Sequence, residues 1–164
     1  LDGNGRVGRL LITLYLVSKG ILKQPILYLS DFFENHRLLY YDNLMLARTN
    51  HNINQWIKFF LTGVIETAKK GVTTFDGILQ LQKQLEIKIK TLRNRSADAK
   101  TIVEYLYNQP IIEVNKVEEL LGKSNVTAYK LVADLEKLDI LVEISGTHRN
   151  KLYVFKDYLD LFKS

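Results

Sequence analysis

The sequence predicts a mainly α-helical protein that ends in a small module of mixed helices and strands. Three observations lead to this prediction. Apolar residues recur at intervals of three and four through most of the first 92 residues, which is the period of amphipathic helices. From residue 96 onward the helical segments are short, and two strand-like runs follow them. The 164 residues, 46% of them hydrophobic, suffice for one ordinary domain or two small ones.

The first domain is predicted over residues 1–70 and is all helical. Residues 7–19 are apolar nearly all round, which is typical of a central buried helix, and Gly20 is placed to cap its end. A second helix should begin at Ser30, a residue suited to the N-cap position, and carry the aromatic side chains of "DFFENHRLLYYDNL".

The most regular amphipathic helix follows in "NINQWIKFFLTGVIETA". Asn52 with Gln55 forms a capping pair at its start, and Gly71 should end it. Residues 71–95 predict a connecting helix with a thinner apolar stripe. We therefore place the domain boundary near residues 93–97.

Residues 96–164 predict the small α+β module. The expected elements are helices over 96–108, from Asn115 to Gly122 and from Ser124 to Leu138, then strands over 140–144 and 151–155. The third helix should carry its apolar residues on one face, namely Val126, Tyr129, Val132, Leu135 and Leu138. Three helices followed by a hairpin is the order of a winged helix-turn-helix.

Charge and composition limit the classes of function. Residues 1–70 carry nine Lys/Arg against five Asp/Glu, residues 71–95 five against two, and residues 96–164 nine against eleven. The positive excess favours an anionic small ligand in the first part over a broad DNA footprint in the last. The absence of cysteine excludes disulfide and thiolate chemistry. No apolar run reaches the length of a membrane span, so we expect a cytoplasmic protein without membrane contact.

The opening "LDGNGRVGRLLI" is the most informative stretch. Gly3, Gly5 and Gly8 satisfy G-x-G-x-x-G, but that dinucleotide fingerprint needs a preceding strand and a βαβ continuation, whereas here helix follows helix. A calcium loop of the EF-hand type is excluded because Arg6 and Arg9 intrude and no acid closes it at the twelfth position. A Walker loop is excluded because Gly-Lys-Ser/Thr is missing.

Two interpretations of this stretch remain. In the first, an Asn-Gly turn simply leads into a helix. In the second, the glycines let backbone N–H groups crowd a phosphate at a helix N-terminus, where two arginines add forked donors. Asp2 fits the second interpretation as a magnesium ligand, because a carboxylate is a poor ligand for phosphate.

The string "LDGNGRVGRLL" resembles the signature HPFxDGNGRxxR of the Fic family with its first three residues removed. The likeness extends through "YLSDFFENHRLLYYDNL" and "NINQWIKFFLTGVIETA", so that residues 1 to about 70 resemble the C-terminal half of the all-α Fic domain. The winged helix at residues 96–164 resembles one that often follows this domain. Members of the family transfer AMP from ATP to a hydroxyl of a target protein, usually with magnesium.

The resemblance implies roles for individual residues. The residues that would bind the phosphates of ATP are Gly3, Asn4, Gly5, Arg6 and Arg9. Asp2 would bind Mg²⁺, and Tyr41, within "YYDNL", would border the nucleoside.

The general base of the family lies outside this resemblance. It is a histidine four residues before the motif acid, a position that would precede Leu1. The histidines of the chain are His36, His51 and His148, and none stands at that position. We therefore expect the chain as printed to be the C-terminal part of a Fic domain and to be inactive by itself.

Two hypotheses about function follow from the sequence. In the first, the chain belongs to a protein adenylyltransferase whose winged helix selects the target protein or forms a homo-oligomer. In the second, it belongs to a nucleotide-sensing, DNA-binding transcriptional regulator. Lys130, Arg149 and Lys151 are the candidate contacts to DNA or to a partner. The acidic excess of residues 96–164 favours a protein partner over DNA.

Overall fold

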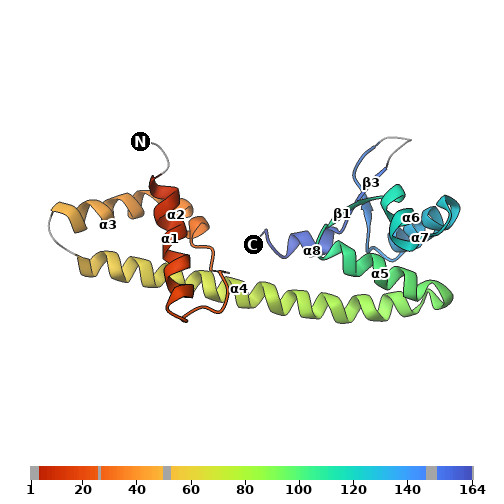
Figure 1. Cartoon of the computed structure of the whole chain (residues 1–164), viewed down its shortest axis with the longest axis horizontal. Helices are drawn as coiled ribbons and strands as arrows, with labels where there is room; N and C mark the ends of the chain where they lie inside the picture. Colours follow the sequence, from red (N-terminus) through yellow and green to blue (C-terminus); the bar gives the residue numbers. More distant parts are fainter. Residues whose placement is uncertain (1–3, 26, 50–52, 147–150, 164) are drawn as a thin grey trace. The chain divides into compact units, whose positions relative to one another are not determined.

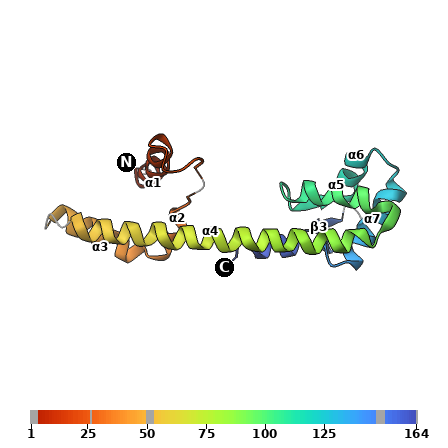
Figure 2. The same ribbon diagram turned by 90° about the horizontal axis from the view of Figure 1, so that it is seen from below.

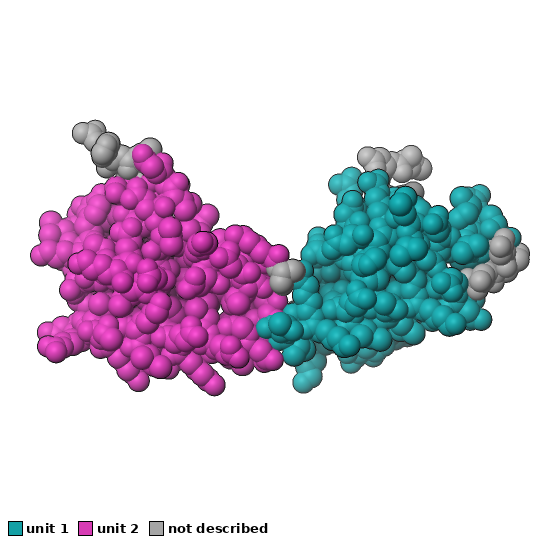
Figure 3. Space-filling model, turned by 180° about the vertical axis from the view of Figure 1, so that it is seen from behind, with its two compact units in different colours: residues 1–73 teal, residues 74–164 magenta. Residues whose placement is uncertain are grey.

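The computed structural model describes residues 4–25, 27–49, 53–146 and 151–163 (Figure 1). The chain divides into two compact units, residues 1–73 and residues 74–164 (Figure 3). The described elements are mainly helices, with one three-stranded antiparallel sheet in the second unit. The predicted fold class, mainly α with a small α+β part, is confirmed.

The regular secondary structure described in the first unit is all helical. Its elements are α1 (Asn4–Ser18), α2 (Ser30–Asn35), α3 (Arg37–Thr49) and the N-terminal part of α4 (Ile53–Lys90). The buried apolar side chains described here are Leu27, Leu29, Phe32 and Phe33. The chain turns after α1 at Gly20, whose φ of 69° confirms the expected glycine cap.

One hydrogen bond fixes α1 on this small core. The hydroxyl of Thr13 donates to the carbonyl of Leu27 at 3.1 Å, and Thr13 is buried. The opposite side of α1 is open, because Leu10, Leu14 and Tyr15 are 59%, 47% and 60% exposed. The prediction that this helix is buried all round is therefore wrong for the described chain. The apolar pattern of the helix shows which side chains can be buried, but it does not show which segment covers them.

The predicted helix from Ser30 is in fact two helices. α2 ends at Asn35, and α3 begins at Arg37, with His36 in a non-helical conformation between them. The Nδ1 atom of His36 lies 2.9 Å from the carbonyl oxygen of Phe32, which also accepts the His36 backbone N–H. This side-chain bond competes with continuation of the helix. Ser30 does not cap α2, because it is already its first helical residue and no side-chain capping bond is made.

The predicted end of a helix at Gly71 is wrong, since α4 runs unbroken from Ile53 to Lys90 (Figure 2). A glycine inside a helix costs only about 1 kcal/mol relative to alanine. Apolar contacts beyond Gly71 offset this cost, because Leu81, Leu85 and Ile89 of α4 are buried in the core of the second unit. Of the predicted capping pair at the start of α4, Asn52 lies outside the described residues.

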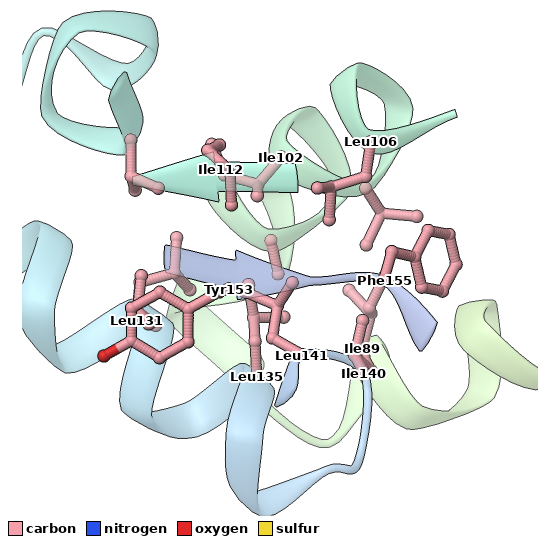
Figure 4. Packing of buried hydrophobic residues seen from close by; sticks show 14 of the residues in the cluster. Ile89, Ile102, Leu106, Ile112, Leu131, Leu135, Ile140, Leu141, Tyr153 and Phe155 are labelled. Carbon is pink, nitrogen blue, oxygen red and sulfur yellow. The ribbon is translucent and has the colours of Figure 1, made fainter. Parts of the chain in front are cut away.

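The second unit packs helices on a small sheet. Its remaining elements are a 3₁₀ turn (Arg93–Arg95), α5 (Ser96–Leu106), β1 (Ile111–Glu113), α6 (Val114–Leu121), α7 (Asn125–Lys137), β2 (Val142–Glu143), β3 (Leu152–Val154) and α8 (Lys156–Asp160). The strand order is β1-β3-β2, with Ile112 opposite Tyr153 and Val142 opposite Val154. Figure 4 shows Phe155, Tyr153 and Leu131 among the side chains that fill the space between sheet and helices.

Helices α5, α6 and α7 and the hairpin of this unit were predicted, whereas β1 and the short helix α8 were missed. The hairpin strands are shorter than the predicted runs, and part of the expected turn, residues 147–150, lies outside the described residues. Strand β1 has only three residues, of which one is buried, so its alternation is too short to recognise. Of the apolar residues predicted to share one face of α7, Val132 and Leu135 are buried, whereas Val126 and Tyr129 are 63% and 45% exposed. The helix also buries Ala128 and Leu131.

Two glycines of α4 provide a matched test of packing in the first unit. A Cβ added at Gly63 would lie 2.5 Å from Cδ1 of Phe32, whereas a Cβ at Gly71 would meet no atom within 4 Å. We expect Gly63→Ala to lower the free energy of unfolding of this unit by about 1–3 kcal/mol, because the buried ring must shift. Gly71→Ala should raise it by about 0.5–1 kcal/mol.

The fluorescence of Trp56, the single tryptophan of the chain, during urea unfolding reports on this unit. Equal effects of the two substitutions would contradict the described packing of Phe32 on α4.

Candidate functional site

The candidate site is the N-terminal end of α1. Because the helix begins at Asn4, Gly5 and Arg6 lie inside its first turn, three residues earlier than the helix predicted from the apolar pattern. The described glycines with positive φ are Gly20, Gly122 and Gly146, so Gly5 has ordinary helical geometry. Asn4 and Gly5 are therefore the first residues of the helix itself rather than a turn that precedes it. Donors for an anion at this end are the N–H groups of the first helical turn, which lack partners within the helix.

Two arginines stand on this end of the helix. Arg6 is exposed and Arg9 is half-buried. A Nη1 atom of Arg9 lies 3.6 Å from the point where a Cβ on Gly5 would be, so its guanidinium folds back over the first turn. Residues three apart on a helix are neighbours, which places Arg6 and Arg9 side by side.

The charge at this end is not compensated within the described chain. The first turn of α1 carries no acidic residue, and neither Arg6 nor Arg9 forms an ion pair with a described residue. Positive side chains at a helix N-terminus oppose the helix dipole, which disfavours each by about 0.3–1 kcal/mol. An anion bound to the N–H groups and to both guanidinium groups would remove this unfavourable interaction.

Other predicted site residues stand apart or lie outside the description. Asp2 and Gly3 precede the described residues, and for Asn4 the structure gives the backbone only. Tyr41 lies on α3 and is 55% exposed. Its ring contacts Tyr40, with the ring centroids 5.3 Å apart, and the guanidinium of Arg37 lies 6.0 Å from its centroid. Its described ring contacts do not include the arginines of α1.

An apolar groove that the sequence did not predict lies beside the candidate site. It has a volume of about 420 Å³ and is lined by Gly8, Leu11, Ile12, Tyr15, Leu16, Trp56 and Phe60. The groove thus runs between α1 and α4, beginning one turn from Gly5. Its walls are apolar, and Gly8, the first of the lining residues, directly precedes Arg9 in the chain.

Magnesium is compatible with this chemistry only in combination with an anion. The described residues contain no group of three or more His, Cys, Asp or Glu side chains that could hold a metal ion by themselves. Mg²⁺ usually binds through one or two carboxylates together with phosphate oxygens and waters. The carboxylate of Asp2 is a suitable ligand for such an arrangement, since donors for phosphate follow it in the sequence. Asp2 itself lies outside the described residues.

Of the predicted contacts in the second unit, Lys130 is exposed on α7 without an ion pair to any described residue, and Arg149 lies outside the described residues. The Nζ atom of Lys151 lies 2.7 Å from a carboxylate oxygen of Glu143, and this hydrogen bond raises the pKa of Lys151 above its ordinary value. Near the start of α7, Lys123 pairs with Asp98 at 2.5 Å. Lys123 and Lys151 therefore already have acidic partners, whereas Lys130 forms no ion pair with a described residue.

Taken with the fold, these features define a helical unit in which two arginines at the start of α1 form no ion pair with described residues, followed by an α+β unit. No protein-family model matches the chain. Within the described ranges, no helix combines the length and the apolar character that crossing a membrane requires.

Proposed function

We propose that this chain belongs to a protein adenylyltransferase of the Fic type, which transfers AMP from ATP to a hydroxyl side chain of a target protein. The observation that carries the proposal is the pair Arg6 and Arg9 at the N-terminus of α1, neither of which forms an ion pair with a described residue. The likeness of "DGNGRVGR" to the Fic signature supports it, because the same residues stand at the spacing of that signature. A polyphosphate is the ligand that best matches two adjacent guanidinium groups and free backbone N–H groups.

The residues of this end of α1 would bind and orient the phosphates. The backbone N–H groups from Gly3 to Gly5 and the guanidinium groups of Arg6 and Arg9 would hold the β- and γ-phosphates. Asp2 would hold Mg²⁺, which when bound neutralises phosphate charge. Tyr41 would border the nucleoside.

The reaction itself is an in-line displacement. The target hydroxyl oxygen forms a bond to the α-phosphorus, the bond between that phosphorus and the pyrophosphate oxygen breaks, and the hydroxyl proton passes to a general base. The base would be a histidine four residues ahead of Asp2. Arg6 and Arg9 would keep their contacts with the pyrophosphate as it leaves and would stabilise the charge that develops on it. This would be the chief contribution of the two arginines.

The open side of α1 supports the proposal that residues 1–70 are the C-terminal part of such a domain. The exposed apolar side chains of α1 are Val7, Leu10, Leu11, Leu14 and Tyr15. A contiguous apolar face of this kind is rare on a complete domain. In the proposed enzyme it packs against the N-terminal part of the Fic domain.

Transfer of label from ATP tests the proposed activity. A protein that contains this chain preceded by the rest of the Fic domain is incubated with α-labelled ATP, magnesium and a lysate. We expect label on protein, and a fall of about tenfold or more with Asp2→Ala. The chain as printed should give none. Equal labelling by the Asp2→Ala protein would contradict the metal role, and absence of labelling by the complete protein would contradict the proposed function.

DNA binding by a winged helix-turn-helix in residues 96–164 is the second candidate function. The order α5, β1, α6, α7, β2, β3 favours that fold, with α7 as the helix that would enter the major groove. The ion pairs of Lys123 and Lys151 disfavour the function, because they remove cations from phosphate contact.

We therefore expect this module to bind a protein, and we expect weak, salt-sensitive binding to DNA. Fluorescence anisotropy of the chain with mixed duplex DNA at low salt measures the binding to DNA. Submicromolar binding that falls steeply with salt and is abolished by Lys130→Ala with Arg149→Ala would establish DNA binding instead.

A further inference from the structure

One side of α7, within the second unit, carries apolar and basic side chains that the described chain leaves uncovered. Val126 and Tyr129 are 63% and 45% exposed, and Ala133 is exposed as well. Lys130 and Lys137 are also exposed, and neither forms an ion pair with a described residue. Their spacing places all five residues on one side of the helix, opposite its buried side. We call this surface the α7 face.

The spacing of the α7 face is that of a coiled-coil seam. Val126, Tyr129 and Ala133 occupy successive a and d positions of a heptad. Lys130 and Lys137 occupy the e positions beside this seam. In a coiled coil the a and d side chains pack against the partner helix, while charges at the e positions select the partner. The exposed side of α7 therefore has the pattern of a helix that binds another helix.

The charges of the α7 face call for acidic groups on the partner. Of the acidic residues of α7, Asp134 forms an ion pair with Arg95, and Glu136 is half-buried at the seam position that follows Ala133. Neither pairs with the two exposed lysines, which are two helical turns, about 10.5 Å, apart along the axis. Acidic side chains seven residues apart on a partner helix would lie opposite both lysines and complement their charge.

A second copy of α7 does not supply those acidic groups. In an antiparallel pair the e positions of the two helices face each other, which would place lysine beside lysine. Like charges at such positions are destabilising. In a parallel pair the e positions face the g positions, which here are Asn125 and the buried Val132. The charge pattern therefore favours a different protein chain.

The first turns of α7 are poorly equipped to read DNA. In a helix-turn-helix the N-terminal residues of this helix contact base edges. Here the Nδ2 atom of Asn125 donates to a carboxylate oxygen of Glu118 at 2.7 Å, and the exposed side chains that follow are Val126 and Tyr129. The sequence of α7 contains neither arginine nor glutamine, the side chains that form bidentate contacts with guanine and adenine. These features favour a protein as the occupant of the α7 face.

We propose that the α7 face binds an amphipathic helix of a different protein, which carries apolar residues at heptad spacing and acidic residues along the edge opposite Lys130 and Lys137. The apolar residues of the partner would cover Val126 and Tyr129, and the small side chain of Ala133 would let the helices approach closely. The proposal rests on the protein-binding role proposed for residues 96–164 and is independent of AMP transfer.

Two synthetic helical peptides test this proposal on the printed chain. Both have leucine at the a and d positions of about three heptads, and the e and g positions are all glutamate in one peptide and all lysine in the other. Fluorescence anisotropy of each labelled peptide measures its affinity for the chain. We expect the glutamate peptide to bind at least about tenfold more tightly, because attractive charge pairs replace repulsive ones. Absence of binding, or equal binding of the two peptides, would overturn the proposal.

A charge exchange separates a specific contact from the general positive charge of the chain. Lys130→Glu with Lys137→Glu should reverse the preference, so that the lysine peptide binds more tightly. Lys83→Glu with Lys90→Glu is the matched control and should leave the preference unchanged. Lys83 and Lys90 are also seven residues apart, exposed on α4 in the second unit, and without an ion pair to a described residue. A reversal by the control, or no reversal by the α7 exchange, would contradict the proposed contact.

Tyr129→Ala tests the apolar part of the contact. It should weaken binding of the glutamate peptide by about tenfold, since it removes a large side chain from the seam. An unchanged affinity would show that the seam does not pack against the peptide.

Other occupants of the α7 face would be recognised with the same variants. Submicromolar binding of duplex DNA that is lost on the α7 charge exchange, without binding of the glutamate peptide, would identify a nucleic-acid surface. A dimer in sedimentation velocity that the same exchange dissociates would identify a second copy. Either result would overturn the proposal. These assays use no ATP, so their failure would leave the labelling assay as an independent test of AMP transfer.

Discussion

In the proposed adenylyltransferase, Arg6→Ala should reduce AMP transfer about 10²- to 10³-fold. The expected loss is large because the guanidinium would act on charge that grows as pyrophosphate leaves, and a binding interaction that strengthens in the transition state affects the rate directly. Arg6 has no described ion pair to lose, so its removal should not unfold the first unit. A steady-state labelling assay at saturating ATP measures the effect.

The control for this prediction is Arg48→Ala. Arg48 is an exposed arginine near the end of α3, in the same unit, and is remote in sequence from the Fic-like motif. The Arg48→Ala protein should transfer label at the same rate as the unmodified protein. A loss with Arg48→Ala equal to that with Arg6→Ala would indicate a general effect of positive charge, and would contradict a specific phosphate contact.

Phe155→Ala should lower the free energy of unfolding of the second unit by about 3–5 kcal/mol. The side chain is 0% exposed and lies between Tyr107 and Tyr158, with ring centroids 5.8 Å and 5.5 Å away. Its backbone N–H also donates to the carbonyl of Pro110 at 2.8 Å, which holds the residue beside the entry to β1. Truncation would leave a cavity that these neighbours can fill only in part.

Phe162→Ala is the matched control, because the ring of Phe162 is 49% exposed at the end of the same segment. It should cost about 1 kcal/mol or less. Native-state hydrogen exchange of the α5 and α7 amides measures both variants within the second unit. Similar protection in the two variants would mean that Phe155 is not central to this core.

The α4 helix illustrates what the sequence could and could not predict. The helical period on either side of Gly71 was correctly recognised, but the glycine was interpreted as an end. Local preference at one residue is weak, about 1 kcal/mol. Here it is outweighed by the burial of Leu81, Leu85 and Ile89. That burial is a tertiary effect, and it is visible only when the second unit is assembled.

The candidate site was predictable in the same limited way. The residue types and spacing of the opening motif predicted phosphate donors at a helix start, and α1 begins within that motif. The position of the Arg9 guanidinium over Gly5 could not be foreseen, because it depends on a side-chain conformation. The groove between α1 and α4 was also missed, since apolar periodicity does not distinguish a side chain packed in a core from one that lines a cleft.

The unequal cores on the two stretches of α4 have a consequence for the order of folding. The C-terminal part of the helix is anchored in a core of eighteen buried side chains, and its N-terminal part belongs to a unit in which four are described. Starting a helix is the costly step, while extending it by one residue is nearly free. Once the second unit has formed, therefore, a finished helical end at Leu81 can propagate back past Gly71 toward Ile53. The aromatic side chains of the first unit would then pack on a helix that has already formed.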